Sequence, residues 1–291
     1  MTLEKLAQRH SVRSYSTEPL SDSAVASLRA AITTINSHEA GLHFSLCLNA
    51  PEAFKGFGRS YGFFRNVRNY IVLTIDSASY PWMEEKAGYY AQMIVMKCVD
   101  MGLGTCYVGG TFSRKHLPVQ LRAGWKVPAV VTIGYPEEEK EGFIARMVRK
   151  GAKRKSKAPL QFYRGNLPWE AAERLFPNLL PALKAIALAP SALNSQPVEI
   201  SIKENKTEED KISRHQDEFR EVEAESRRFL LSPISSAMPL RLNFDMDYEI
   251  SAQVPSSKQL IDLGIAIWNF EQLFPGYWEW GNPARFIPLK D

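Results

Sequence analysis

Apolar positions in the first half of the chain change between helical spacing and strand-like runs. Val25, Leu28 and Ile32 recur at intervals of three and four residues after Ser21, a residue type that favours a helix start. A continuous apolar run lies within residues 70–75, as in a strand buried on both faces. The predicted elements are a short helix near residues 3–6, a helix over 22–36, strands over 42–48 and 70–75, a long helix over 84–101 and a strand over 129–134.

The second half is organised around the segment APSALNSQP, residues 189–197. Helical spacing over 183–188 predicts a helix before it, and alternation over 198–203 predicts a half-buried strand after it. Pro190 and Pro197 disfavour the helical conformation at the residues before them, so we expect an extended segment between them. Its hydroxyls and amides suit the edge of a flat ligand with many heteroatoms, but the same residue types are common in ordinary turns.

The order of elements in the first half recurs in the second. Residues 86–104 parallel residues 260–280, and both are long apolar helical stretches that end in glycine and aromatic residues. A charged insertion over about 203–228 predicts a solvated loop or surface helix. Two similar units in one chain predict a fused pseudo-dimer, with a first repeat over 1–157 and a second over 158–291. Because no low-complexity linker separates the units, we expect them to be intertwined.

Composition narrows the class of protein. A chain of 291 residues can bury a large core, and a net charge of only +4 argues against nucleic acid as the partner. Three cysteines without zinc-type spacing support neither a disulfide framework nor a metal site, and they favour a reducing compartment. No segment approaches the roughly 20 apolar residues that span a membrane, and the first residues lack a signal-peptide core. The sequence therefore predicts a cytoplasmic protein with no membrane partner.

Two further segments carry candidate chemistry. RHSVRSY, residues 9–15, brings together two arginines and two serines, which suits an anion, although a solvated basic turn has the same composition. GLGTCYVGG, residues 102–110, has glycines that would let a ligand approach the backbone closely, although its first two glycines also fit a helix end. A Rossmann nucleotide loop is not indicated, because these glycines follow a helix. The sequence shows no metal-ligand spacing and no nucleophile motif.

The segments RHSVRSY, GLGTCYVGG and APSALNSQP resemble motifs of the FMN-dependent nitroreductase family, in the family's order. The chain resembles in particular the branch in which two half-sized units are fused, and the resemblance covers most of its length. It implies an α+β, nitroreductase-like fold with two intertwined repeats, each with a mostly antiparallel sheet and a long central helix. It also implies FMN as cofactor, NAD(P)H as electron donor, and an electron-poor small-molecule acceptor such as a nitro compound or a quinone.

The resemblance also implies which residues hold the cofactor. They are Arg9, His10, Ser11 and Arg13 at the phosphate, Val108, Gly109 and Gly110 at the flavin edge, Pro190, Ser191, Asn194 and Gln196 from the second half, and Lys153 and Arg154 as further phosphate contacts. Tyr61, Phe63 and Phe64 either form a substrate lid over the ring or belong to a core or surface aromatic loop. No protein residue is expected to be catalytic, because the flavin itself carries the hydride.

The two halves have retained different motifs. The first has TINSHEA, residues 34–40, in place of the polar loop, and the second has NLPWE, residues 166–170, in place of the phosphate motif. Glu39 and Glu170 would put carboxylates near a phosphate in the second, symmetry-related site, which is unfavourable. We therefore expect one complete site and one FMN in a monomer that acts as an intramolecular pseudo-dimer. The alternatives are a non-catalytic flavin- or ligand-binding relative, or another flavin reaction such as reductive dehalogenation or flavin breakdown.

Overall fold

The computed structural model describes residues 1–55, 64–137, 156–204 and 248–289. The predicted helices and strands of the first half are confirmed, and Ser21 caps α2 by accepting a hydrogen bond from the Ala24 amide (3.2 Å). The elements are α1 (Leu3–Gln8), α2 (Asp22–His38), β1 (Leu42–Cys47), a 3-10 turn (Pro51–Ala53), β2 (Asn69–Ile75), α4 (Met83–Asp100), β3 (Gly104–Val108), a 3-10 turn (Arg114–His116) and β4 (Lys126–Gly134).

The second half contains a similar series of elements. The long apolar stretch 260–280 is only partly helical, because its aromatic end forms a strand. The charged insertion predicted over 203–228 lies almost entirely outside the described residues. The elements are a 3-10 turn (Pro159–Phe162), α6 (Trp169–Leu175), α7 (Leu179–Ala187), a 3-10 turn (Ala192–Asn194), β5 (Glu199–Glu204), β6 (Tyr248–Gln253), a 3-10 turn (Ser257–Gln259), α9 (Leu260–Glu271), β7 (Gly276–Glu279) and β8 (Ala284–Pro288).

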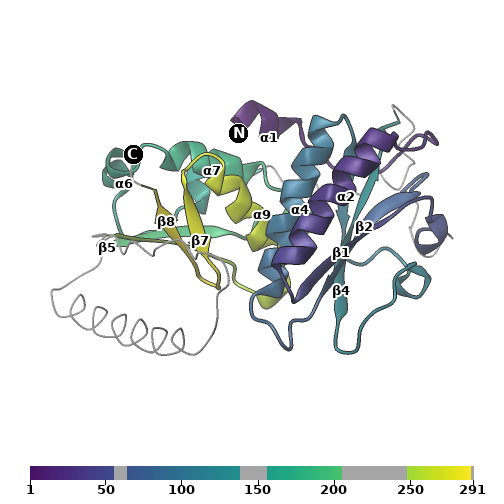
Figure 1. Ribbon diagram of the computed structural model, residues 1–291. Coiled ribbons are helices and arrows are strands. Elements are labelled where there is room, and N and C mark those ends of the chain that lie inside the picture. The colour runs from purple at the N-terminus through teal and green to yellow at the C-terminus, as the bar shows by residue number, and fades with distance from the viewer. Residues whose placement is uncertain (56–63, 138–155, 205–247, 290–291) are drawn as a thin grey trace, which may run out of the picture.

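Two four-stranded antiparallel sheets form the framework of the fold. Their strand orders are β1-β2-β4-β3 and β5-β6-β8-β7, so the second sheet repeats the first strand for strand. Figure 1 shows α4 and α9 side by side between the two sheets. The predicted α+β fold with two mostly antiparallel sheets is confirmed. The boundary between repeats at residues 157 and 158 stays a prediction.

Helices α4 and α9 approach each other closely through glycines. A Cβ atom on Gly88 would collide with the carbonyl oxygen of Ile261, and a Cβ atom on Gly264 would collide with the carbonyl oxygen of Glu85. Ile261 follows Glu85 by 176 residues, and Gly264 follows Gly88 by the same number. Each helix therefore places its glycine against the equivalent carbonyl of the other helix, so the two contacts are reciprocal. Reciprocal contacts are typical of the interface between two like subunits.

The first sheet is covered differently on its two faces. Helices α2 and α4 cover one face, where Leu28 and Phe44 are buried among aliphatic side chains. Loops cover the other face, where Phe54 packs against Tyr70 with their ring centroids 5.4 Å apart. Burying each of these large apolar side chains contributes roughly 1.5–3 kcal/mol to folding. None of the described helices is long and apolar enough to cross a membrane.

The outer edges of the sheets are capped by other parts of the chain. On β1, the Asn36 side chain accepts a hydrogen bond from the Phe44 amide (2.7 Å) and donates one to the Phe44 carbonyl (2.9 Å). On β5, Tyr163 forms a parallel bridge with Ile200, and the Arg164 amide donates to the Ile200 carbonyl (2.8 Å). Backbone groups that are paired in this way are not available to a further strand.

The segment 189–197 is not extended as its two prolines led us to expect. Leu193, Asn194 and Gln196 have φ angles of 52°, 51° and 47°, in the left-handed region. Such angles are uncommon for residues other than glycine, and Gln196 adopts one even though it precedes Pro197. Hydrogen bonds with the backbone of Lys157 and Ala187 hold the Gln196 side chain in place, and these outweigh the local preference. The prediction of an extended segment is therefore wrong.

Candidate functional site

The segment that carries RHSVRSY lies along the free edge of β3. Ser11 forms a parallel bridge with Thr105, and the Val12 amide donates to the Thr105 carbonyl (2.9 Å). A Cβ atom on Gly104 would overlap the Val12 side chain, so this glycine permits the close approach. The Tyr15 hydroxyl donates to the Val12 carbonyl (2.7 Å). The segment is therefore fixed against the sheet.

Two positive charges are held together at this edge. Burial lowers the pKa of the Arg9 guanidinium, and the nearby charge of Arg13 lowers it further. The Arg9 Nε atom is buried and has no hydrogen-bond partner among the described residues. Neither arginine forms an ion pair with any of the residues that the structure describes. A buried N–H group of a guanidinium without an acceptor is costly, so an anion such as a phosphate group fits this position.

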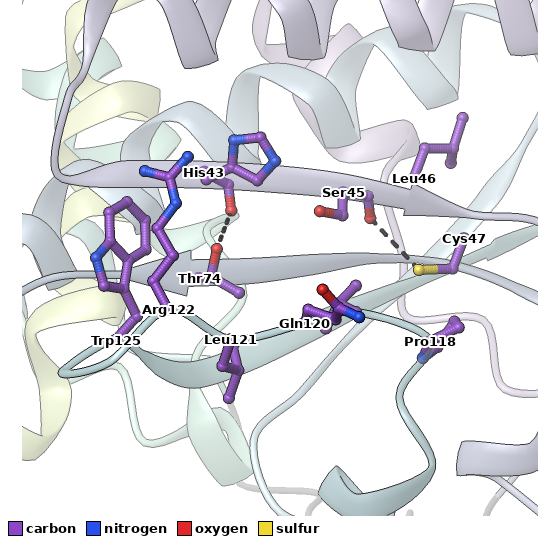
Figure 2. A pocket seen from close by; sticks show the side chains of 11 residues that line it. His43, Ser45, Leu46, Cys47, Thr74, Pro118, Gln120, Leu121, Arg122 and Trp125 are labelled. Atoms are coloured by element: carbon purple, nitrogen blue, oxygen red, sulfur yellow. Dashed lines mark hydrogen bonds between the residues drawn. The ribbon is translucent and has the colours of Figure 1, made fainter.

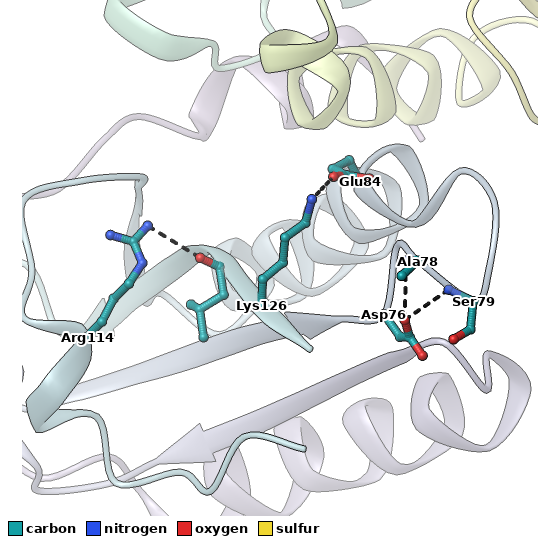
Figure 3. A network of polar contacts seen from close by, with 7 residues as sticks. Asp76, Ala78, Ser79, Glu84, Arg114 and Lys126 are labelled. Atoms are coloured by element: carbon teal, nitrogen blue, oxygen red, sulfur yellow. Dashed lines mark hydrogen bonds and ion pairs between the residues drawn. The ribbon is translucent and has the colours of Figure 1, made fainter. Parts of the chain in front are cut away.

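The turn after β3 leaves its backbone open to a ligand. A Cβ atom on Gly109 or Gly110 would meet nothing within 4 Å. The guanidinium of Arg114 donates to the carbonyl oxygens of Gly109 (3.1 Å) and Val127 (3.4 Å), and Figure 3 shows this arginine reaching across to β4. Arg114 thereby fixes the orientation of the peptide after Gly109. The open turn and the buried Arg9 both suit FMN, with its phosphate at one end and its ring at the other.

The loop 189–197 of the second half is held by its own polar groups. Gln196 is buried, and its side chain accepts from the Lys157 amide (2.7 Å) and donates to the Ala187 carbonyl (2.9 Å). The Ser191 hydroxyl accepts from the Gln196 amide (2.9 Å). These bonds shape the loop and use both ends of the Gln196 amide. The Ser195 hydroxyl, in contrast, is buried and unpartnered among the described residues.

Asp262, in the first turn of α9, holds this loop against the helix. Both of its carboxylate oxygens lie 3.3 Å from the Ala192 amide nitrogen, which donates to them. Burial raises the pKa of Asp262 to about 6, and the Ala192 hydrogen bond lowers it in part. Burial also raises the pKa of the Tyr107 hydroxyl. The positive charge of Arg9 lowers this pKa, and the negative charge of Asp262 raises it. Tyr107 also packs against the buried core of the second half, so the two halves meet at this residue.

A chain of buried hydrogen bonds runs beneath this site from one half to the other. The Tyr107 hydroxyl donates to Gln92 (3.2 Å), and the Gln92 amide donates to Asn269 (3.0 Å). Asn269 in turn donates to the Ala185 carbonyl of α7 (2.9 Å). Gln92 and Asn269 are almost completely buried, so their pairing fixes β3, α4, α9 and α7 relative to one another.

A family model described as "Putative TM nitroreductase" matches residues 1–273. The chain belongs to this nitroreductase family. Among solved structures, a protein described as a "putative nitroreductase" from Thermotoga maritima MSB8 is 17% identical, covers 98% of this chain and 92% of its own, and gives a TM-score of 0.52. An FMN-dependent nitroreductase from Clostridium difficile R20291 is 19% identical and covers 48% of this chain and 90% of its own, with a TM-score of 0.38. No curated protein matches the chain.

The remaining residues expected from the nitroreductase motifs are placed less directly. His10 is exposed, with its ring Nδ1 3.2 Å from the Gln8 carbonyl. Phe64 packs edge to face on Phe54, with ring centroids 5.6 Å apart, and so adjoins the core. Val108 is buried at the end of β3, and Pro190 is half-buried. Outside the described residues lie Tyr61 and Phe63 of the expected lid and the expected phosphate contacts Lys153 and Arg154.

Sequence reasoning missed the polar residues that hold the elements of the candidate site together. Tyr107 lies inside the GLGTCYVGG motif but is not one of its glycines, and Gln92 and Asp262 are polar residues at buried positions of their helices. A polar side chain on the buried face of a helix needs a partner, so this pattern was an available signal. The sequence did not indicate which residues are the partners, because the bonded residues lie 15 to 177 positions apart in the chain.

The residue that corresponds to Asp262 in the first half lies in a cluster of charged and aromatic side chains. Lys86 precedes Asp262 by the same 176 residues that relate the two helix glycines, and its Nζ atom lies 2.8 Å from Glu39. The Tyr90 hydroxyl donates to the same carboxylate (3.1 Å), and Lys86 lies 5.6 Å from the ring centroid of Trp280. Glu170 is not part of this cluster: it is exposed on α6. The placing of Glu39 and Glu170 in a second, symmetry-related site stays a prediction.

Proposed function

We propose that this chain is an FMN-dependent oxidoreductase that takes electrons from NAD(P)H and passes them to an electron-poor acceptor such as a nitro compound or a quinone. The observation that carries the proposal is the pair Arg9 and Arg13, which forms no ion pair with the described residues and lies beside a β3 edge followed by an open glycine turn. Membership of the nitroreductase family supports the same reaction class.

The phosphate of FMN would lie at the arginine edge. Arg9 and Arg13 would donate charge-assisted hydrogen bonds to it, each worth about 1.5–3 kcal/mol. Ser11 is in the same segment, but its hydroxyl interacts with the Cys106 thiol. Burial raises the pKa of that thiol, and the interaction with Ser11 lowers it in part. Ser11 would have to turn from that thiol to reach the phosphate, so the two arginines carry most of the proposed affinity.

The ring of FMN would lie between the turn after β3 and the loop 189–197. Backbone amides at Gly109 and Gly110 would face the ring edge, where negative charge develops on reduction. Ser191 and Asn194 would approach from the second half, on a loop that Asp262 holds through the Ala192 amide. Bound FMN supplies the hydride chemistry. The protein's part is to bind the ring, hold it between two rigid halves and stabilise its charge.

We further propose that the chain forms one site and acts as an intramolecular pseudo-dimer. The reciprocal contacts of Gly88 and Gly264 and the matching strand orders support a two-fold relation between the halves. The cluster of Glu39, Lys86 and Trp280 fills the second position. A single complete site needs elements from both halves, so neither half alone would bind the cofactor.

Stopped-flow absorbance of the FMN-loaded protein tests the proposed reaction. Mixing with NADH or NADPH without oxygen should bleach the flavin band, and a nitroaromatic or quinone should then restore it. Steady-state rates should give parallel lines in double-reciprocal plots, as in a ping-pong mechanism. If FMN binds but neither nucleotide reduces it, the chain is a flavin-binding relative and the proposed activity is wrong.

A further inference from the structure

A groove separate from the candidate site lies on the first sheet, at the edge opposite to β3. Its volume is about 330 Å³, near the lower end of the range for small-molecule sites. Side chains of β1 and β2 form one wall and residues 118–122 with Trp125 form the other, as Figure 2 shows. Strands β2 and β4 separate β1 from β3, so the groove lies roughly 14 Å across the sheet from the proposed flavin edge.

One end of the groove is cationic. Figure 2 shows the guanidinium of Arg122 beside the imidazole of His43. Burial lowers the pKa of His43, and the positive charge of Arg122 lowers it further. None of the eleven described residues that line the groove is acidic, and Arg122 has no ion pair with the described part of the chain. This end therefore has donors and positive charge without an acceptor.

The geometry of Arg122 leaves its donors available. Its guanidinium lies 5.0 Å from the centroid of the Trp125 ring, a cation–π contact that supports one face of the group. The N–H groups at the edge of a stacked guanidinium remain free to bind a carboxylate through two hydrogen bonds. Ser45 adds a hydroxyl to the wall, whereas the Thr74 hydroxyl is already used by the His43 carbonyl (2.6 Å).

The other end of the groove is apolar, with Leu46, Pro118 and Val119 in its wall. An extended peptide is a poor candidate for the occupant, because Asn36 already pairs with the outward amide and carbonyl of Phe44 on β1. The volume suits one ring rather than a chain of residues. We propose that this groove binds a small carboxylate with an apolar, single-ring body, its carboxylate between Arg122 and His43.

Histidine NMR with benzoate as the probe tests this site on the FMN-loaded protein. Benzoate should shift the His43 ring signals, which are identified by their loss in His43→Gln, and should raise the pKa of His43 because it brings a negative charge. Benzamide has the same ring but no charge, and inorganic phosphate has charge but no ring. Each should bind at least about tenfold more weakly than benzoate.

Two variants separate this site from general anion binding. Arg122→Gln should weaken benzoate by at least about tenfold. Arg285→Gln removes an arginine of β8, which pairs with Glu279, and should leave benzoate affinity unchanged. The proposal is overturned if phosphate binds as tightly as benzoate, if Arg122→Gln binds benzoate normally, or if benzoate perturbs the flavin spectrum but not the His43 signals. None of these results depends on turnover, so failure of the proposed oxidoreductase activity leaves the test intact.

Discussion

The Nζ atom of Lys86 lies 2.8 Å from a carboxylate oxygen of Glu39, and the two side chains are only 18% and 15% exposed. Under the proposed two-fold relation between the halves, this partly buried ion pair lies where the second sheet would carry the counterpart of the candidate site. A carboxylate there repels a phosphate, and Lys86 is already engaged by Glu39 and lies over Trp280. The two sides of the molecule have thus become chemically different while keeping the same strand order.

One FMN should therefore bind per 291-residue chain. Isothermal titration with FMN, or phosphate analysis of the purified complex, measures the ratio directly. A ratio of two would contradict the single composite site. The double variant Glu39→Gln with Lys86→Gln is a useful control, because it removes the ion pair but supplies no arginines, and it should still bind only one FMN.

Arg13→Ala should weaken FMN by well over tenfold while leaving the fold intact. Arg13 is exposed, and its side chain makes no ion pair within the described chain, so the loss would fall on the ligand and not on packing. Fluorescence titration of FMN measures the affinity, and circular dichroism checks the fold. Arg29→Ala is the matched control, because Arg29 is an exposed arginine on α2. Equal affinity in Arg13→Ala and Arg29→Ala would sink the phosphate assignment.

Much of the fold could be predicted because it depends on local pattern. The periodicity around Leu28 and the apolar run near Val72 indicated α2 and β2 within a few residues of their observed bounds. The recurrence of the element order indicated the second sheet. The helix crossing could not be predicted. A glycine inside a helix, such as Gly88 or Gly264, only lowers helix propensity unless the backbone that packs against it is known, and that backbone lies 173 to 179 residues away.

The candidate site was harder to predict than the fold. The motif with Arg9 indicated an anion site. Gln196 was expected to contact the cofactor, but its side-chain amide is hydrogen-bonded to the backbone of Lys157 and Ala187. Leu193 and Asn194 take left-handed angles that no local residue pattern required. The contact of Asp262 with the loop 189–197 depends on an amide 70 residues away. Such long-range contacts decide side-chain roles, and one sequence does not contain them.

Asn194→Ala should weaken the same FMN that Arg13→Ala weakens, although the two residues lie in different halves. Asn36→Ala tests the corresponding asparagine of the first half. Because Asn36 pairs with both backbone groups of Phe44, its loss should lower the free energy of unfolding by about 1–3 kcal/mol without changing FMN affinity. Urea unfolding and FMN titration on each variant give both quantities. If Asn36→Ala weakens FMN and Asn194→Ala does not, the loop 189–197 is not part of the site.

Asp262 should make the stability of the protein depend on pH. Its folded-state pKa is raised to about 6 from an ordinary value of 3.8, because burial disfavours the charged form. Its stabilising contribution is therefore complete below about pH 4 and is lost as the pH rises through 6. A shift of about two pH units corresponds to about 3 kcal/mol.

Asp262→Asn keeps an oxygen that can accept from the Ala192 amide but does not ionise in this range. Relative to wild type, its free energy of unfolding should increase by up to about 3 kcal/mol between pH 4 and pH 7. Urea unfolding at pH 4, 5, 6 and 7 measures the difference, with Asp22→Asn as the control for an exposed acid in the first turn of α2. FMN titration of two variants tests separately whether Asp262 shapes the site. Asp262→Asn should retain FMN affinity and Asp262→Ala should lose FMN affinity, because only alanine leaves the Ala192 amide without an acceptor. A constant difference across the pH series, or equal FMN affinity in the two variants, would show that Asp262 does not hold the loop.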